Sequence, residues 1–283
     1  MPSAKPKLGQ NFLTSPSIRQ QIVEALGDVS QSTVLEIGPG RGALTDLLAQ
    51  RARNLIAVEL DRQMAPALIN KWQHAPRVHI VQADILHLDL AALPPSVGIH
   101  TGDPLFVVGN LPYYITSDIL LHLFAHAAAV RRAVVMVQDE VAERVAADFG
   151  DSDYGLLSAT AQMHASVEKL FVVPPEAFSP PPQVHSAVLR LAMHPRFQEL
   201  RVERTAFLRF LQNCFRQKRK TLANNLRNLP GWDRQQLVAA IAGAGLDASV
   251  RAEAVSLESM ARLFLALQTP PGVVRAPVAE ARQ

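Results

Sequence analysis

Short apolar runs recur along the first two thirds of the chain. Runs of about four to eight apolar residues are typical of strands buried on both faces of a sheet. The pattern predicts strands at residues 33–37, 55–58, 78–81, 105–108 and 133–137. Helical spacing of apolar residues before the first run and after the last one indicates helices packed on the same sheet. We therefore expect an α/β fold with a mostly parallel sheet.

The pattern changes in the last third of the chain. A strand near residues 167–173 leads into a proline-rich loop, and residues 184–191 alternate as a final strand should. From about residue 201 the apolar residues recur at helical spacing only. We expect an α/β domain over residues 1–193, a helical domain over residues 194–270, and a disordered tail over residues 271–283.

Four of the predicted strands in succession end in residues suited to ligand contact. The first runs into the glycine loop Gly38–Gly42, the second ends at Glu59, the third is followed by Asp84, and the fourth ends at Asn110. In open α/β sheets ligands bind at the carboxyl ends of the strands. Glu59 is placed to accept from ribose hydroxyls, and Asp84 could accept from an adenine amino group. These positions predict a nucleotide-like ligand.

The glycine loop leaves the kind of nucleotide open. Gly38, Gly40 and Ala43 fit the looser dinucleotide fingerprint, so a nicotinamide cofactor is compatible with the spacing. Glu36 stands two residues before the first glycine, where a carboxylate suits a cationic ligand better than a pyrophosphate. S-adenosylmethionine carries a sulfonium and an ammonium and no phosphate, so we favour it as the cofactor.

The stretch Asn110–Tyr113 combines an amide, a proline and an aromatic ring within four residues. Pro112 restricts Leu111 to an extended conformation, which stiffens the backbone. A planar amino-bearing ring could stack on Tyr113 while its amino group donates to Asn110 Oδ1 and the Leu111 carbonyl. The alternative is a plain turn, because Asn and Pro are common turn residues.

Composition limits the class of protein. The chain has 283 residues, 48% of them hydrophobic and 19% charged, which suits a globular enzyme. No apolar run reaches the roughly 20 residues that span a bilayer. The N-terminus lacks the apolar stretch of a secretory signal. Its single cysteine, Cys214, excludes an internal disulfide framework and a thiolate zinc cluster. We expect a cytoplasmic protein without membrane association or a bound metal.

Charge is divided unevenly along the chain. Residues 1–193 carry 14 Lys and Arg against 18 Asp and Glu, a net charge of −4, whereas residues 194–283 carry 14 against 7, a net charge of +7. Within the basic part, Arg216, Lys218, Arg219 and Lys220 fall in five consecutive positions. They form a candidate contact surface for nucleic-acid phosphates, the alternative being a solvated helix face.

With these residues in place, the chain resembles the small-subunit ribosomal RNA adenine N6,N6-dimethyltransferases. The resemblance covers nearly the whole chain. The glycine loop marks the cofactor class, and Asn110–Tyr113 marks amino methylation. The segments that carry the resemblance are residues 9–13 (Gly-Gln-Asn-Phe-Leu), 36–42, 110–113, 178–186 and 219–221, together with Glu59 and Asp84.

The resemblance implies a Rossmann-like methyltransferase sheet with a small all-helical C-terminal domain, acting as a monomer on small-subunit rRNA. Its reaction would transfer methyl groups to N6 of two adjacent adenosines near the 3′ end during ribosome biogenesis. The implied cofactor contacts are Asn11, Leu13, Gly38, Glu59, Asp84 and Asn110. The implied catalytic residues are Asn110, Leu111, Pro112, Tyr113 and Phe178, with Phe178 stacking on the target base opposite Tyr113.

Two departures and two alternatives remain at this point. Tyr114 stands where the family often has Asn, and Leu156 where a basic residue is common. The same Asn-Leu-Pro-Tyr chemistry would serve a DNA adenine-N6 methyltransferase. The chain could also be a ribosome-assembly factor whose transferase activity is secondary.

Overall fold

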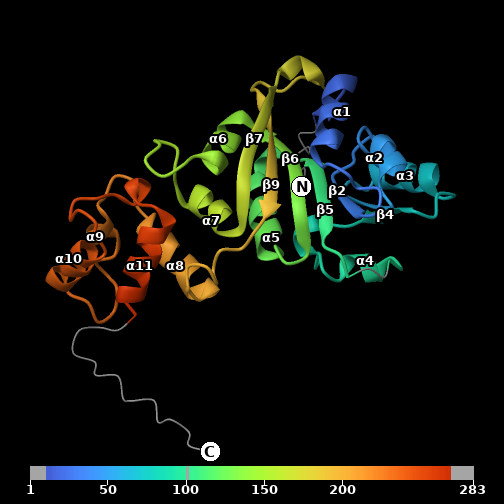
Figure 1. The fold of residues 1–283 in the computed structure, drawn as a ribbon. Coiled ribbons are helices and arrows are strands. Elements are labelled where there is room, and N and C mark those ends of the chain that lie inside the picture. The colour runs from blue at the N-terminus through green and yellow to red at the C-terminus, as the bar shows by residue number, and fades with distance from the viewer. Residues whose placement is uncertain (1–10, 100–101, 269–283) are drawn as a thin grey trace, which may run out of the picture. The chain divides into compact units, whose positions relative to one another are not determined.

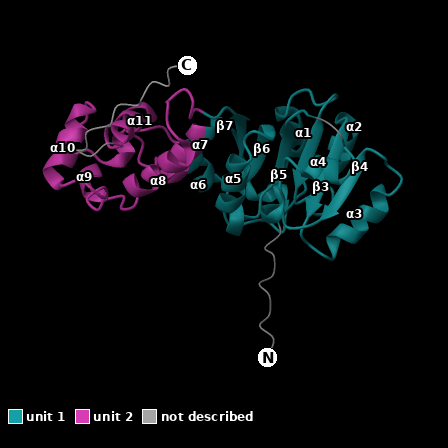
Figure 2. Ribbon diagram, turned by 90° about the horizontal axis from the view of Figure 1, so that it is seen from below, with its two compact units in different colours: residues 1–146, 164–195 teal, residues 147–163, 196–283 magenta. Residues whose placement is uncertain are grey.

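A computed structural model describes residues 11–99 and 102–268. The chain divides into two compact units, one of residues 1–146 and 164–195 and the other of residues 147–163 and 196–283 (Figure 2). The domain boundary expected after residue 193 differs from this division in residues 147–163 and 194–195. The apolar pattern gave no reason to assign residues 147–163 to the second unit. The expected tail of residues 271–283 lies outside the described residues.

The first unit is built on a seven-stranded sheet in the order β4-β3-β2-β5-β6-β9-β7 (Figure 1). Its strands are β2 (Thr33–Ile37), β3 (Asn54–Glu59), β4 (Val78–Gln82), β5 (Leu105–Asn110), β6 (Val130–Gln138), β7 (Ala165–Val173) and β9 (Ser186–Met193). The expected Rossmann-like sheet is therefore confirmed. The last strand begins two residues later than the alternating pattern predicted.

The order of the strands creates a switch point in the sheet. Strands β4, β3, β2, β5 and β6 run parallel, and β9 runs antiparallel to both β6 and β7. The chain leaves β2 toward β3 and β4, whereas it leaves the neighbouring strand β5 toward β6. Connections that diverge from adjacent strands open a crevice at their carboxyl ends, where ligands bind in such folds.

The sheet is covered on both faces, because every residue of β2 is buried. The helices of this unit are α1 (Pro16–Ala25), α2 (Thr45–Arg51), α3 (Met64–Trp72), α4 (Leu93–Ser96), α5 (Thr116–Ala125) and α6 (Asp139–Ala146). Helix α7 (Leu156–His164) belongs to the other unit except for its last residue. In α1, Ile22 and Val23 pack in one apolar cluster with Val34 of β2 and Val108 of β5. In α6, Val141 and Val145 are buried.

Short elements join these helices and strands. They are β1 (Phe12–Leu13), β8 (Phe178–Ser179) and the 3-10 helices η1 (Ile85–His87), η2 (Tyr113–Ile115) and η3 (Pro175–Ala177). Strands β1 and β8 pair antiparallel, with Leu13 opposite Phe178. This pair was not predicted, because two residues carry no periodicity.

The second unit is helical, as expected for the C-terminal part. It contains α8 (Arg204–Cys214), α9 (Leu222–Asn225), α10 (Arg234–Gly243), η4 (Ala252–Ala254) and α11 (Leu257–Ala266). Phe207 and Phe210 of α8 pack against Phe264 of α11, with ring centroids 5.2 and 5.4 Å from that of Phe264. Tyr154 is buried in the same core, which is why residues 147–163 belong to this unit.

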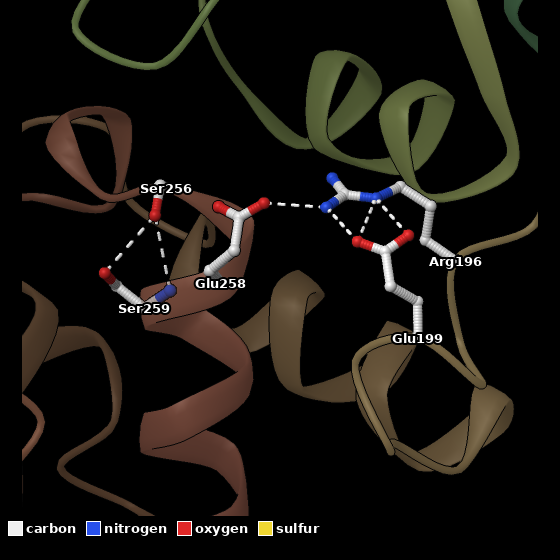
Figure 3. A network of polar contacts seen from close by, with 5 residues as sticks. All are labelled: Arg196, Glu199, Ser256, Glu258 and Ser259. Carbon is white, nitrogen blue, oxygen red and sulfur yellow. Dashed lines mark hydrogen bonds and ion pairs between the residues drawn. The ribbon is translucent and has the colours of Figure 1, made fainter.

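An ion-pair network ties the start of the second unit to its last helix (Figure 3). The guanidinium of Arg196 lies 2.7 Å from a carboxylate oxygen of Glu199 and 2.7 Å from one of Glu258. These bonds raise the pKa of Arg196 and lower that of Glu258. One arginine thus links the chain entering the unit to the first turn of α11.

Candidate active site

A cavity of about 350 Å³ opens at the carboxyl ends of β2, β3 and β5. It lies at the switch point of the sheet, where a nucleotide-like ligand was expected. All six predicted cofactor residues and the predicted Asn110–Tyr113 stretch line it. These residues are Asn11, Leu13, Gly38, Glu59, Asp84, Asn110, Leu111, Pro112 and Tyr113.

The glycine loop forms one wall of this cavity between β2 and α2. Gly40 has a φ of 58°, and a Cβ added there would lie 3.2 Å from the Phe12 ring. The Arg41 guanidinium lies 4.2 Å from the centroid of the same ring, in cation–π contact. Gly40 therefore lets the loop turn left-handed while Phe12 packs closely against it.

Two carboxylates hold the glycine loop. Glu59 Oε2 accepts a 2.9 Å hydrogen bond from the Gly40 amide, and Glu59 Oε1 accepts a 2.8 Å bond from the Asp61 amide. Each carboxylate oxygen has a second lone-pair site, so Glu59 can still accept from ribose hydroxyls. Glu36 Oε2 accepts a 2.7 Å bond from the Thr45 hydroxyl at the start of α2.

Glu36 is 2% exposed and lines the cavity. Burial raises the pKa of the Glu36 carboxyl to about 8, and the negative charges of Asp46 and Glu59 add to that shift, although the bond from Thr45 opposes it. A cation bound in the cavity would stabilise the ionised form of this buried carboxyl. The donor set of the cavity therefore fits a cationic nucleoside such as S-adenosylmethionine better than a phosphate-bearing cofactor.

Asp84 follows β4 and caps the 3-10 helix η1. Its Oδ1 accepts a 3.0 Å hydrogen bond from the Leu86 amide, and its Oδ2 lies 3.6 Å from His87 Nδ1. The cap fixes the carboxylate at the edge of the cavity. Asp84 keeps lone-pair sites for an exocyclic amino group, as its assignment requires.

Asn110 ends β5 beside the crowded crossing with β2. A Cβ at Gly109 would lie 2.7 Å from the Ile37 carbonyl oxygen, so only glycine fits between the two strands. The amide of Asn110 donates a 2.9 Å bond from Nδ2 to the Asn11 carbonyl. Because a carbonyl only accepts, the NH₂ group must face it and Oδ1 is turned away from Asn11.

The peptide that follows Asn110 is fixed on one side and open on the other. The Leu111 amide donates to the Met136 carbonyl at 3.0 Å, and the Pro112 carbonyl accepts from the Ile115 amide and the Thr116 hydroxyl. Among residues 11–99 and 102–268, nothing donates a hydrogen bond to the Leu111 carbonyl. The Leu111 carbonyl and Asn110 Oδ1 could therefore each accept one hydrogen from the amino group of a bound ligand.

Tyr113 is held by its hydroxyl group. It lies 2.6 Å from Ser186 Oγ at the start of β9, and burial raises the pKa of the Tyr113 phenol. No local sequence pattern links Ser186 to Tyr113, because 73 residues separate the two side chains. The bond fixes the plane of the ring at the cavity wall.

Phe178 lies elsewhere. It is 4% exposed in β8, within the apolar cluster of the first unit, and it is absent from the cavity lining. Stacking on a target base opposite Tyr113 would require the ring to leave this packing. The stacking role of Phe178 stays a prediction.

The segment of residues 11–14, here called the strap, lines the cavity, and only Asn11 and Leu13 of it were predicted as cofactor contacts. Thr14 donates from its amide and its hydroxyl to the Ala177 carbonyl, at 2.7 and 2.9 Å. Arg19 of α1 donates to the Leu13 and Thr14 carbonyls at 3.1 and 2.9 Å. No sequence pattern singled out Arg19, because arginine is common on helix surfaces. The predicted motif residues 9 and 10 lie outside the described residues.

The predicted RNA-contacting residues form an exposed turn between α8 and α9, residues 216–220, here called the basic turn. Asn225 holds it: its Nδ2 donates to the Cys214 carbonyl at 2.7 Å and its Oδ1 accepts from the Gln217 amide at 3.1 Å. Lys218 donates to the Ser152 carbonyl at 2.7 Å. All four basic side chains are exposed. They are Arg216, Lys218, Arg219 and Lys220.

Within the described part of the chain, no three His, Cys, Asp or Glu side chains are grouped as metal ligands. Over the same residues, no helix has the length and apolar character needed to cross a bilayer.

Comparison with known proteins gives one consistent family. The family model described as ribosomal RNA adenine dimethylase matches residues 1–269. A ribosomal RNA small subunit methyltransferase A of Acidobacterium capsulatum is 56% identical over 264 residues, which are 93% of this chain and 91% of the relative. The protein of that name from Enterococcus faecalis is 39% identical over 269 residues, 94% of this chain and 91% of the relative.

Solved structures agree with the fold. A dimethyladenosine transferase from Plasmodium falciparum matches 90% of this chain and 96% of its own, with a TM-score of 0.75 and 23% identity. The 23S rRNA methyltransferase ErmE matches 92% of this chain and 100% of its own, with a TM-score of 0.69 and 28% identity. Both matches extend over most of the chain, well beyond the sheet.

Proposed function

The chain belongs to the ribosomal RNA adenine dimethylase family, and from that membership we propose that it dimethylates N6 of two adjacent adenosines near the 3′ end of small-subunit rRNA. Its activity is rRNA adenine dimethylation with S-adenosylmethionine. The small-subunit substrate is supported by the relatives named small subunit methyltransferase A, which match over more than nine tenths of this chain. We place its action in the cytoplasm, where bacterial ribosomes are assembled.

The cofactor fits the cavity by the chemistry of its lining. Glu59 would accept from the ribose hydroxyls, Asp84 from the adenine amino group, and the glycine loop would lie along the methionine part. Glu36 supplies the carboxyl that favours a cation there. When bound, S-adenosylmethionine supplies an electrophilic methyl group on a positively charged sulfur.

The residues that act on the target base are Asn110, Leu111, Pro112 and Tyr113. The exocyclic N6 of adenine is a weak nucleophile, because its lone pair is delocalised into the ring. Asn110 Oδ1 and the Leu111 carbonyl would each accept one N6 hydrogen, which favours a tetrahedral nitrogen with its lone pair directed at the methyl group. Pro112 stiffens this pair of acceptors, and Tyr113 stacks on the base.

Alignment of the nitrogen with the methyl group then supplies most of the rate. A strong base is not required, because N6 becomes acidic only after it is alkylated. For the second methyl transfer one hydrogen remains, so a single acceptor suffices and the pocket must admit an N-methyl group. The observation that carries the mechanism is the Asn110 amide, whose NH₂ group is bound to Asn11 and whose oxygen is thereby turned away from it.

The test uses methyl-labelled S-adenosylmethionine with small-subunit rRNA, intact small subunits, large-subunit rRNA and DNA in separate reactions. Digestion of the small-subunit reactions should give labelled N6,N6-dimethyladenosine. Asn110→Ala should abolish the product, whereas Asn70→Ala, an exposed asparagine of α3, should leave it unchanged. Labelled N6-methyladenine in DNA alone would favour the DNA methyltransferase alternative. Size-exclusion chromatography with light scattering measures the mass of the enzyme in solution and tests the expectation of a monomer.

A further inference from the structure

The strap meets three parts of the first unit at once. Its Asn11 carbonyl accepts from the Asn110 amide at 2.9 Å, and its Phe12 ring lies against Gly40 and Arg41 of the glycine loop. Thr14 bonds the Ala177 carbonyl at its other end. The position of the strap therefore decides how the Asn110 amide is oriented, because no other residue among 11–99 and 102–268 forms a hydrogen bond with that side chain.

Arg19 fastens the strap from α1. Its Nε donates to the Leu13 carbonyl at 3.1 Å and its Nη2 to the Thr14 carbonyl at 2.9 Å. The guanidinium is a rigid planar fork, so these two bonds fix two consecutive peptide groups together. No carboxylate of the described residues pairs with Arg19 at ion-pair distance. Its hydrogen bonds are therefore made to the backbone of the strap, and the side chain also lines the cavity.

We propose that Arg19 is a positioning residue for methyl transfer. By holding the Leu13 and Thr14 carbonyls it keeps the Asn11 carbonyl against Asn110 Nδ2, and so keeps Asn110 Oδ1 aimed at the N6 of the target adenosine. This proposal rests on the catalytic role of Asn110 proposed above. Arg19 itself contacts neither the base nor the reacting methyl group in this mechanism.

The geometry gives the expected size of the effect. A terminal amide torsion is broad and roughly two-fold, so the Asn110 side chain needs an external partner to select one orientation. A misplacement of about 1 Å near reacting atoms can lower a rate by about 100-fold. The β1–β8 pair and the Thr14 bonds still hold the strap without Arg19. We therefore expect a loss of roughly 10-fold in kcat, smaller than that limit.

The experiment compares Arg19→Ala and Arg19→Lys with a control on the same helix. Gln20→Ala is the control, because Gln20 bonds only Glu24 on the exposed face of α1. Arg19→Ala should lower kcat by roughly 10-fold and raise KM for S-adenosylmethionine by a few fold, since Arg19 lines the cavity together with Asn11 and Leu13. KM for rRNA should stay the same. Arg19→Lys, which can reach one carbonyl at a time, should restore part of kcat, and Gln20→Ala should match wild type.

Two further measurements separate positioning from general loosening of the fold. In single-turnover assays, Arg19→Ala should cost little when it is added to Asn110→Ala, because the group through which it acts is gone. The side-chain NH₂ resonance of Asn110, assigned by its loss in Asn110→Ala, should shift in Arg19→Ala and stay in place in Gln20→Ala.

Three results would overturn the proposal: wild-type kcat in Arg19→Ala, an additive loss in the double variant, or an unshifted Asn110 resonance. Failure of the proposed function looks different, because Asn110→Ala would then retain activity. An inactive Asn110→Ala beside a fully active Arg19→Ala would reject Arg19 alone.

Discussion

The hydroxyl group of Thr45 donates a 2.7 Å hydrogen bond to Oε2 of Glu36, and both side chains are buried in the first unit. The bond joins the end of β2 to the first residue of α2 across the glycine loop. It compensates only part of the cost of burying a carboxylate, since burial raises the pKa of Glu36 to about 8.

Glu36 should therefore make stability fall as pH rises toward 8. Between the unfolded value near 4.5 and the folded value near 8 the folded chain keeps a proton that the unfolded chain has lost. The free energy of unfolding then decreases with pH across that window and levels off above it. Glu36→Gln imitates the protonated form and should remove this pH dependence. The total change in the free energy of unfolding that Glu36 causes across the window is on the order of a few kcal/mol.

Urea denaturation of wild type and Glu36→Gln at pH 5, 6, 7 and 8 measures this difference. Other titrating groups affect both proteins alike, so the gap between the two curves isolates Glu36. Parallel curves over the whole range would mean that the carboxyl is ionised in the folded protein.

Glu59 should contribute strongly to cofactor binding. Glu59→Ala removes the expected partner of the ribose hydroxyls and also frees the Gly40 amide that Glu59 holds. We expect S-adenosylmethionine to bind more weakly by about 1.5–3 kcal/mol, the range of hydrogen bonds to charged groups. Isothermal calorimetry measures the change, with the exposed neighbour substitution Arg62→Ala as control. An unchanged Kd would remove Glu59 from the cofactor site.

Phe178→Ala should have two separable effects. Because Phe178 is buried, its truncation leaves a cavity and should lower stability by about 3–5 kcal/mol. If the ring also stacks on the target base, turnover should fall as well, while cofactor affinity at a temperature where the variant is folded stays close to that of wild type.

Phe178→Leu tells the two roles apart. Leucine keeps much of the apolar volume, so most of the stability should return, but it offers no aromatic face. Low turnover in a stable Phe178→Leu protein would support stacking. Wild-type turnover would leave Phe178 as a core residue of the β1–β8 pair.

The residues that could be predicted best from the sequence are those at the carboxyl ends of the parallel strands. Short apolar runs marked the strands, and a parallel sheet brings their carboxyl ends to one edge, so Glu59, Asp84 and Asn110 could be placed together without coordinates. Gly109 directly follows the predicted strand of residues 105–108, and nothing in the sequence shows that glycine is required there. The structure shows the reason, because a Cβ at this position would lie 2.7 Å from the Ile37 carbonyl oxygen.

Local patterns could not show contacts between distant segments. Thr14 and Ala177 are 163 residues apart, and Asn11 and Asn110 are 99 apart. Such pairs depend on how loops close over a finished sheet, and each involves backbone groups that every residue type carries. The same reason hid Arg19, whose partners are carbonyls.

The basic turn should set the salt dependence of RNA binding. Arg219 and Lys220 are exposed, and Asn225 holds the backbone of the turn, so their charges are presented on a fixed support. Lys218 already donates to the Ser152 carbonyl, which makes the other two the better pair to test. Each phosphate contact releases counterions, so removing both charges should flatten the slope of log affinity against log salt by up to about 1.4–1.8 units.

Filter binding or fluorescence anisotropy with small-subunit rRNA from low to high salt gives this slope for wild type and for Arg219→Ala/Lys220→Ala. The control Arg234→Ala/Arg262→Ala removes two exposed charges from the same unit outside the turn. Affinity for S-adenosylmethionine should not change in either variant, because the cofactor cavity is lined by residues of the first unit alone.

The first 193 residues carry a net charge of −4, so a polyanion needs a basic surface elsewhere. An unaltered slope in the turn variant would move the main RNA contact away from the turn, with Lys5 and Lys7, which lie outside the described residues, as the next pair to neutralise.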